Sequence, residues 1–359
     1  MFKTLRTVLC AGLAVAASLG VAQAQTKIKY GAYHTANETF IKEITQMMDT
    51  ITERTDGEVV FEPYYAGSLL KAQDLYPGMS RGAVDMVTSA PQAFNTRDYP
   101  LTGVVLPFMS DNPLATTMAF QDWVDANPEV GEEFDRNGAH LLFGWSLGEN
   151  VLWTKKAVTE ASDLEGMRIR MLLGPGEALS ILGATAVATP YTEAIDLLQR
   201  GGVDGISTTF FDQGVRDGLG DVSDYVSSAG DMGVFAVMLT SIRKPVWEGF
   251  DEQTRDIFNE EIALATERYF ASLDEAIDGA VDKLAENERI QIGEISADEA
   301  ARWRELTQDE LHSNYNDRAK TVNADGQKLI DDFTARIAEY ETQYPYQTGI
   351  ERFAAQKGE

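Results

Sequence analysis

The longest helical pattern in the chain limits the folds that it can adopt. Between Asp251 and about Leu284, apolar residues recur in steps of three or four with no intervening proline. A helix of about 34 residues is about 50 Å long, whereas a small domain is about 30 Å across. The pattern lacks the sustained apolar heptad of a coiled coil. It therefore predicts a helix that runs across two lobes of one protein.

The sequence ahead of this helix alternates between strand and helix patterns. Strand patterns at residues 27–34, 57–67 and 83–91 are separated by helical patterns at 37–55 and 73–82. This alternation is typical of an α/β domain with a largely parallel sheet. The first lobe is therefore predicted to have this architecture.

A second unit of the same kind follows between residues 163 and 210. Consecutive strand patterns across 140–158 precede it, which indicates that the chain passes from one lobe to the other there. An apolar strand at 233–245 is placed to cross back. Further helices are predicted at 296–322 and 326–345.

The first residues of the chain have the pattern of a secretory signal peptide. Two basic residues precede an apolar run from Thr7 to Val21, and the small residues at 22–24 form an A-x-A cleavage site. Residues 1–24 are therefore predicted to be a bacterial type of signal that is removed on export. The single cysteine, Cys10, lies in this segment, so the mature chain is expected to have neither disulfides nor thiol chemistry.

The charge balance excludes several classes of partner. The chain has 57 acidic and 30 basic residues and a formal net charge of −27. This charge argues against nucleic acid or an anionic membrane surface as a partner. No segment after the signal peptide is long and apolar enough to cross a bilayer, so direct membrane insertion is not expected.

Motifs for catalysis, metals and cofactors are missing from the sequence. The histidines, His34, His140 and His312, are far apart, and HExxH, P-loop and GxSxG motifs do not occur. The loop at 174–176 lacks the third glycine of a dinucleotide site. No metal or cofactor is therefore predicted, although an exported α/β enzyme that acts on a small acid stays an alternative.

A short strand pattern at 163–171, DLEGMRIRM, carries the chemistry that stands out most. Its apolar residues alternate with Arg168 and Arg170, as in a half-buried strand. An arginine fixed on a strand in so acidic a protein is a candidate to receive an anion. The alternative is that both arginines form ion pairs at the surface.

The region from Asp163 to Gly205 resembles the core signature of the DctP-like solute-binding proteins of TRAP transporters. The similarity lies in DLEGMRIRM, ILGA, a proline followed by Thr-Glu, and LLQRGGVDG. Weaker similarities occur at 64–86 and in LPFM at 106–109. The resemblance implies a two-lobed periplasmic binding protein with a ligand cleft between its lobes. It also implies transport rather than catalysis, with a small organic acid as ligand and TRAP permease subunits in the membrane as partners.

The resemblance also implies a division of the chain into lobes. Lobe 1 is expected to contain residues 25–148 and about 236–275, and lobe 2 residues 149–235 and about 276–359. No apolar stripe is left over on the predicted helices to require a dimer, so a monomer is expected.

Within this family pattern, Arg170 is the residue that is expected to receive the ligand carboxylate. Two positions depart from what many members have. Asn150 stands near the position of a second arginine, and Thr208 stands in place of an asparagine. The ligand is therefore expected to depend on one arginine and on shape, which disfavours sugar acids and simple dicarboxylates.

Other candidate ligand-binding residues lie near the predicted strand ends, where open α/β sheets bind ligands. Aromatic residues there would suit an apolar acid, although they could equally be core between the lobes. These aromatic candidates are Trp145, Trp153, Phe210 and Phe211. The first-lobe candidates are Tyr33, His34, Phe94 and Asn37, which is also a possible cap of the helix at 37–55.

Overall fold

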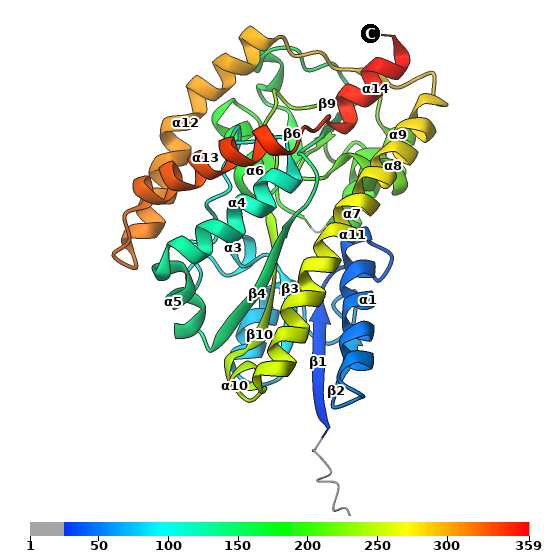
Figure 1. Cartoon of the computed structure of the whole chain (residues 1–359). Coiled ribbons are helices and arrows are strands. Elements are labelled where there is room, and N and C mark those ends of the chain that lie inside the picture. Colours follow the sequence, from blue (N-terminus) through cyan, green and yellow to red (C-terminus); the bar gives the residue numbers. More distant parts are fainter. Residues whose placement is uncertain (1–24, 190, 359) are drawn as a thin grey trace, which may run out of the picture.

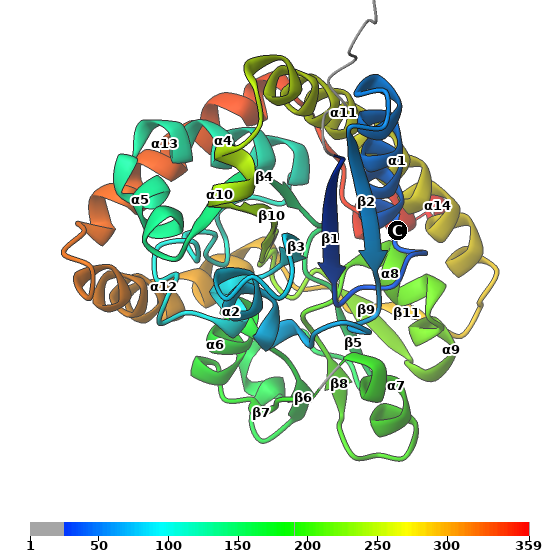
Figure 2. The ribbon, with the colours of Figure 1, turned by 90° about the horizontal axis from the view of Figure 1, so that it is seen from below.

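The computed structural model describes residues 25–189 and 191–358, which fold around two separate β-sheets (Figures 1 and 2). The first sheet has the strand order β2-β1-β3-β10-β4, and the second has the order β11-β9-β5-β8-β6-β7. The strands of the first sheet are β1 (Thr26–Ala32), β2 (Val59–Tyr64), β3 (Met86–Ser89), β4 (Ala139–Ser146) and β10 (Val237–Arg243). Those of the second are β5 (Leu152–Thr154), β6 (Arg168–Arg170), β7 (Thr185–Val187), β8 (Gly205–Ile206), β9 (Tyr225–Ser227) and β11 (Gln291–Ile292).

Helices cover both sheets. Those before the first crossing between the lobes are α1 (Thr39–Arg54), α2 (Leu75–Ser80), α3 (Pro91–Phe94), α4 (Pro113–Ala126) and α5 (Pro128–Arg136). Those between the two crossings are α6 (Leu173–Ile181), α7 (Tyr191–Gln199), α8 (Phe211–Arg216) and α9 (Leu219–Val222). The remainder are α10 (Lys244–Glu248), α11 (Glu252–Ala285), α12 (Ala297–Lys320), α13 (Gly326–Gln343) and α14 (Gly349–Lys357).

The first sheet is parallel only among its early strands. β1 pairs in parallel with β2 and β3, as the strand–helix alternation predicts. β10 runs antiparallel to both β3 and β4, because the chain enters it on its return from the second lobe. The carboxyl end of β1 points toward the half of the molecule that contains α7 and α8 (Figure 1). The residues that follow β1 are thus directed toward the second lobe.

The long helix α11 spans both lobes, which confirms the prediction from its periodicity. It packs against α1 in the first lobe and against α8 and α14 in the second, and it runs along both halves of the molecule in Figure 1. Near its start, the ring of Phe258 lies 6.1 Å from that of Phe61. Near its end, Leu284 is buried against Gly220 of α9. The Asp251 side chain caps its first turn by accepting a 2.8 Å hydrogen bond from the Thr254 amide.

Three segments meet where the chain passes between the lobes, and we call this region the interlobe crossing. Residues 147–151 lead out to β5, and residues 228–236 return to β10. The two segments are joined by a 2.8 Å hydrogen bond from the Asn150 amide to the Gly233 carbonyl. The third segment is residues 346–349. The Glu149 carboxylate binds it, because it accepts hydrogen bonds from the Gly349 amide (2.7 Å) and the Tyr346 hydroxyl (2.9 Å).

The last helices contact both halves of the molecule. α12 packs against α6, whereas α13 packs against α4. The Trp123 indole of α4 donates a 3.0 Å hydrogen bond to the carbonyl of Leu329 in α13. The predicted division into residues 25–148 with 236–275 and 149–235 with 276–359 stays a prediction. Over residues 25–189 and 191–358, no helix has both the length and the apolar character of a membrane span.

Several local predictions differ from the structure. Asn37 is exposed and is not the cap of α1, because the helix begins at Thr39 and Glu38 takes the cap position. α6 begins at Leu173, so the loop predicted at 174–176 is its first turn, where proline is tolerated. The short elements that the sequence patterns did not predict are α3, α5, α8, α9, α10, α14, β9 and β11. The predicted signal peptide lies outside the described residues.

Candidate functional site

Arg170 of β6 is a buried cation that is held by backbone carbonyls. Its side chain is 3% exposed. Nε donates to the Thr189 carbonyl and Nη1 to the Thr208 carbonyl, both at 3.2 Å. The guanidinium also lies 5.5 Å from the centre of the Tyr191 ring. Within residues 25–189 and 191–358, no carboxylate lies within ion-pair distance of it, so its charge is not neutralised there.

The neighbouring arginine on the same strand has a different role. Arg168 is exposed, and its Nη2 lies 2.9 Å from Oδ1 of Asp204. The same aspartate also accepts a 2.9 Å hydrogen bond from the Arg168 amide. Two residues apart on a strand, the arginines share a face, but Arg168 is the exposed first residue of β6 and only Arg170, its last residue, is buried.

Side chains from the first lobe lie within electrostatic range of Arg170. The Tyr33 ring lies 3.8 Å from that of His34 and 5.5 Å from that of Phe94, between centres. Burial raises the pKa of Tyr33, the charge of Glu38 raises it further, and the charge of Arg170 opposes this rise. Both charged groups therefore lie close to Tyr33. We call the region around Tyr33, Glu38 and Arg170 the interlobe boundary.

Burial also fixes the charge states of two of these groups. It lowers the pKa of His34 to about 3, so the imidazole is neutral at physiological pH. It lowers the pKa of Arg170 to about 10, which leaves the guanidinium charged. The cation that faces Tyr33 is therefore the arginine and not the histidine.

Asn150 and Thr208 shape the site around Arg170. Oδ1 of Asn150 accepts hydrogen bonds from the Ser207 hydroxyl (2.9 Å) and the Thr208 amide (2.8 Å). The Thr208 hydroxyl bonds both the amide and the carbonyl of Leu172 at 2.8 Å. Thr208 has a φ of 59°, which a β-branched residue rarely adopts. These bonds hold its carbonyl where Arg170 needs an acceptor.

The predicted aromatic residues separate into two groups. Tyr33 and Phe94 are half-buried beside each other at the interlobe boundary. Trp153 and Phe211 are buried, with ring centres 6.3 Å apart. Phe211 is the first residue of α8, and Gly214 of the same helix lies against Trp153. Phe210 is nearly buried and lies against Gly148 of the interlobe crossing. The remaining candidate, Asn37, is exposed.

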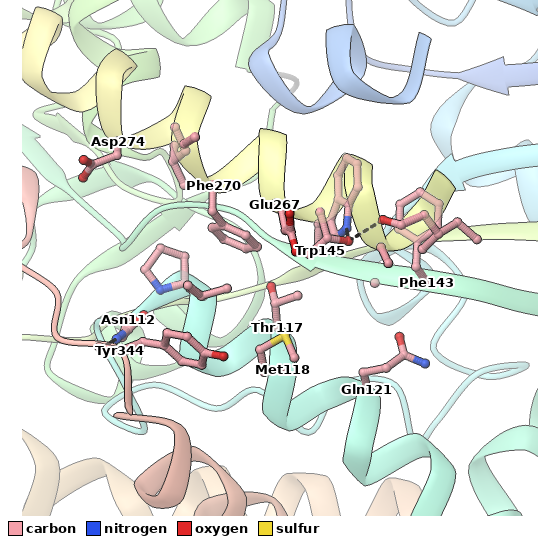
Figure 3. A pocket seen from close by; sticks show the side chains of 18 of the residues that line it. Asn112, Thr117, Met118, Gln121, Phe143, Trp145, Glu267, Phe270, Asp274 and Tyr344 are labelled. Atoms are coloured by element: carbon pink, nitrogen blue, oxygen red, sulfur yellow. Dashed lines mark hydrogen bonds between the residues drawn. The ribbon is translucent and has the colours of Figure 1, made fainter. Parts of the chain in front are cut away.

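Trp145 lines a different part of the molecule. A cavity of about 880 Å³ lies between α4, β4, α11 and residues 344–346 (Figure 3). Trp145 stacks on Tyr269 with ring centres 4.9 Å apart, and its indole donates to the Thr266 hydroxyl at 2.9 Å. Arg170 does not line this cavity. This cavity is therefore separate from the site around Arg170, despite its volume.

Buried polar atoms without partners mark the interlobe boundary instead. Six side-chain atoms there have no hydrogen-bond partner in the part of the chain that the structure describes: His34 Nδ1, Glu38 Oε2, Asn150 Nδ2, Thr189 Oγ1, Tyr191 Oη and Asp212 Oδ1. Leaving such a group unpaired costs about 1–3 kcal/mol, so buried polar groups are usually paired. Other described residues, such as Glu133 and Trp153, also have such an atom. The six atoms at the boundary come from both lobes, which indicates a place where a polar ligand or ordered water supplies the partners. Among the described residues, no cluster of His, Asp and Glu has an arrangement for a metal ion.

Sequence patterns missed two residues of this region. Glu38 lies in the loop after β1, close to the predicted Tyr33, and Tyr191 follows β7. The strand-end rule that selected Tyr33 and Phe94 would also have found Tyr191 if it had been applied to β7. The rule was applied to β1 but did not select Glu38, whose burial shows only in the folded chain.

The family comparison covers most of the chain. Residues 30–318 match the family described as bacterial extracellular solute-binding protein, family 7, or DctP. A solute-binding protein of Sulfitobacter sp. (strain NAS-14.1) is 26% identical over 211 residues, which are 57% of this chain and 63% of that protein. The chain thus matches less than two thirds of the length of that relative.

Two further proteins match over longer stretches. The ectoine/5-hydroxyectoine-binding periplasmic protein UehA of Ruegeria pomeroyi is 24% identical over 291 residues, which are 79% of this chain and 82% of that protein. The structure of a TRAP solute-binding protein from Rhodoferax ferrireducens, in complex with copurified benzoate, has a TM-score of 0.75 and 20% identity. That match covers 89% of this chain and 99% of the other, and it shows the same two-lobed fold.

The comparisons decide between the receptor and the exported enzyme that the sequence left open. The matched family consists of transport proteins, and the fold and the match over residues 30–318 agree with it. The chain therefore belongs to the family-7 bacterial extracellular solute-binding proteins, the DctP-type receptors of TRAP transporters, and it is not an enzyme.

Proposed function

We propose that this receptor captures a small organic acid at the interlobe boundary through its carboxylate and Arg170. One observation carries the proposal. Arg170 is the only arginine among the described residues that is buried, and its partners there are backbone carbonyls rather than carboxylates. A buried charge without a counterion is costly, so a ligand carboxylate would complete the site.

The geometry of the guanidinium suits this role. It is planar and permanently charged, and it can give a carboxylate two parallel hydrogen bonds. Its bonds to the carbonyls of Thr189 and Thr208 hold it in place before the ligand arrives. Little side-chain entropy is then lost on binding.

Aromatic rings beside Arg170 would enclose the body of the ligand. Tyr33 and Phe94 come from the first lobe and Tyr191 from the second. Benzoate, the ligand of the Rhodoferax protein, is an aromatic carboxylate, and ectoine is a small cyclic molecule with one carboxylate. Both ligands suit a site with one arginine and aromatic walls, which supports a ligand with a compact ring.

Binding between the lobes would couple capture to closure. A ligand that touches Arg170 in one lobe and Tyr33 in the other shifts the population toward the closed form. The closed form would then be recognised by TRAP permease subunits in the membrane, with the receptor acting as a monomer in the periplasm. Uptake of the ligand into cells that lack either the receptor or the permease should be lost.

The matched variants Arg170→Ala and Arg168→Ala test the carboxylate contact. Removing one member of a desolvated charge pair costs about 2–5 kcal/mol, or roughly 30- to several-thousand-fold in affinity. Arg170→Ala should lose affinity by this factor for the carboxylates that a thermal-shift screen selects, starting with benzoate and ectoine. Arg168→Ala, at the exposed first residue of the same strand, should bind as the wild type does. Calorimetry that finds equal affinities for wild type and Arg170→Ala would contradict the proposal.

A further inference from the structure

A buried glutamate of the first lobe lies beside the same boundary. Glu38 follows β1 at the cap of α1 and is 8% exposed. Its Oε1 accepts a 3.1 Å hydrogen bond from the Thr35 amide, whereas its Oε2 is buried with no partner in the described part of the chain. A carboxylate that is half paired in this way requires a donor from outside these residues.

The part of the second lobe that acts on Glu38 is also acidic. Arg216 of α8 lies 3.8 Å from Oδ2 of Asp212 and 3.1 Å from Oδ1 of Asp217. These three groups all act on the ionisation of Glu38. The one guanidinium is therefore already paired with two aspartates. Asp212 is 5% exposed, and its Oδ1 also lacks a partner in the described chain.

The opposite charge is that of Arg170 in the second lobe. Arg170 and Glu38 both act on the Tyr33 hydroxyl, with opposite effects, so the tyrosine lies near both. Arg170 lacks a carboxylate partner, and Glu38 lacks a donor for one of its oxygens. The interlobe boundary thus has a cationic end at Arg170 and an anionic end at Glu38 and α8.

We propose that the ligand is a zwitterion, whose carboxylate binds Arg170 and whose protonated nitrogen donates to Glu38. This inference rests on the proposed function, because it takes Arg170 as the carboxylate site. Hydrogen bonds between two charged groups are about twice as strong as neutral ones. A single zwitterion would supply the missing partner at both ends of the boundary, which makes the burial of both charges tolerable.

Other classes of small acid fit this arrangement less well. A second carboxylate on the ligand would meet Glu38, Asp212 and Asp217, and like charges in a desolvated site repel strongly. A ligand with an apolar far end would bury Oε2 of Glu38 without a donor. Only a cationic nitrogen with N–H groups satisfies both the charge and the hydrogen-bonding capacity of this end.

Matched pairs of probes isolate the contribution of the protonated nitrogen of the ligand. 4-(Aminomethyl)benzoate and 4-methylbenzoate share a ring and a carboxylate but differ in the protonated nitrogen. Pipecolate and cyclohexanecarboxylate form a second pair, in which the nitrogen lies closer to the carboxylate. Calorimetry at pH 8 with the full exported protein gives the four dissociation constants. In each pair that binds, the zwitterion should bind at least about tenfold more tightly.

Substitutions then assign the effect to Glu38. Glu38→Gln should weaken zwitterion binding about 10- to 100-fold, because a hydrogen bond between charged groups is lost, and should not weaken binding of the matched plain acid. Glu53→Gln is the control, since Glu53 is an exposed residue of the same helix α1, and it should change neither. Circular dichroism melting curves of all variants establish that each one is folded.

The outcomes separate this inference from the proposed function. Equal affinities for a zwitterion and its matched acid in the wild type would overturn the inference. An equal loss for both probes in Glu38→Gln would overturn it too, because Glu38 would then be structural. In either case, loss of all binding in Arg170→Ala still supports the carboxylate site. Unchanged binding in Arg170→Ala would instead reject the proposed function itself.

Discussion

The interlobe boundary beside Arg170 and the cavity beside Trp145 differ in how their polar groups are paired. At the boundary, buried atoms such as Nδ1 of His34 and Oη of Tyr191 lack partners among the described residues. Around the cavity, the Trp145 indole donates to the Thr266 hydroxyl, and the side-chain amide of Asn112 donates to the Tyr344 carbonyl (Figure 3). No buried side-chain atom of the cavity lining lacks a partner within residues 25–189 and 191–358.

This difference separates a feature of the fold from a feature of function. Paired polar groups stabilise the fold in which they are found, whereas unpaired buried groups destabilise it until a ligand arrives. The volume of about 880 Å³ beside Trp145 would suggest a ligand site if volume were the only criterion. Unsatisfied hydrogen-bonding capacity points to the boundary instead, where both lobes contribute residues.

The largest expected effect on stability is at Trp145. Trp145→Ala removes the stacking on Tyr269 and should lower the free energy of unfolding by about 3–5 kcal/mol. The affinity of the folded protein for its carboxylate ligand should stay within about twofold. Urea denaturation and calorimetry measure the two quantities, with Trp145→Phe as the milder control. A tenfold loss of affinity in folded Trp145→Ala would place the cavity in the ligand site.

The boundary should make the ligand-free protein less stable as the pH rises. Burial raises the pKa of Glu38 to about 7 and that of Asp212 to about 6, from 4.5 and 3.8. The folded chain then holds more protons than the unfolded chain between about pH 4 and pH 7. The free energy of unfolding therefore falls as the pH increases through this window.

Glu38→Gln isolates the part of this pH dependence that comes from the boundary. Glu133 also has a buried carboxyl group, with a pKa raised to about 8, so the wild type has a steeper total dependence. Arg216, Asp212 and Asp217 act on Glu38 from the second lobe. Glu38→Gln should reduce the loss of stability between pH 5 and pH 8 by about 1–3 kcal/mol, as urea denaturation measures. If the free energy of unfolding of Glu38→Gln depended on pH as that of the wild type does, the pKa of Glu38 in the fold would equal its value in water.

A smaller effect is expected from the hydrogen bond at the cavity. Thr266→Val keeps the size of the side chain but removes the acceptor of the Trp145 indole. The free energy of unfolding should fall by about 1 kcal/mol, with no change in ligand affinity. Denaturation curves of Thr266→Val and Thr266→Ser make the comparison, since serine keeps the hydroxyl. Equal stability of the wild type and both variants would mean that this bond does not stabilise the fold.

The smallest effect is expected at Asn37. This residue is exposed and does not cap α1. Asn37→Ala should change stability by less than about 0.5 kcal/mol and leave affinity unaltered. Calorimetry of the wild type and Asn37→Ala with one ligand from the thermal-shift screen compares the two affinities. A loss of affinity would extend the boundary to the exposed end of the loop after β1.

Long periodic elements could be predicted from the sequence, and short ones could not. α11 was recognised because its apolar spacing continues over about nine turns, which no competing structure produces. β9, with three residues, and β11, with two, are shorter than any window in which a period can be measured. They are strands only because β5 and β9 offer neighbours in space. Such elements depend on tertiary contacts that the local sequence does not contain.

The site was predictable to the extent that it depends on one strand. The period of β6 places Arg168 and Arg170 on the same face, so only the family resemblance implies which of the two receives the ligand. The place of Trp145 was not predictable, because a shift of one residue along a strand reverses the face to which a side chain points. Glu38 was missed for another reason. It is one of 57 acidic residues, and most acidic side chains are exposed, so its burial becomes visible only in the folded chain.

The continuity of α11 limits how this receptor moves. A single helix of 34 residues packs on α1 in one lobe and on α8 and α14 in the other. The lobes can separate only if this helix bends or if one lobe slides along it, and both disturb packed side chains. Opening should therefore be a small rotation of one lobe relative to the other about α11, rather than a wide separation of the lobes. Fluorescent labels on the two lobes would then report a displacement of a few ångströms on ligand binding, and the permease would have to distinguish loaded from empty receptor by a change of that size.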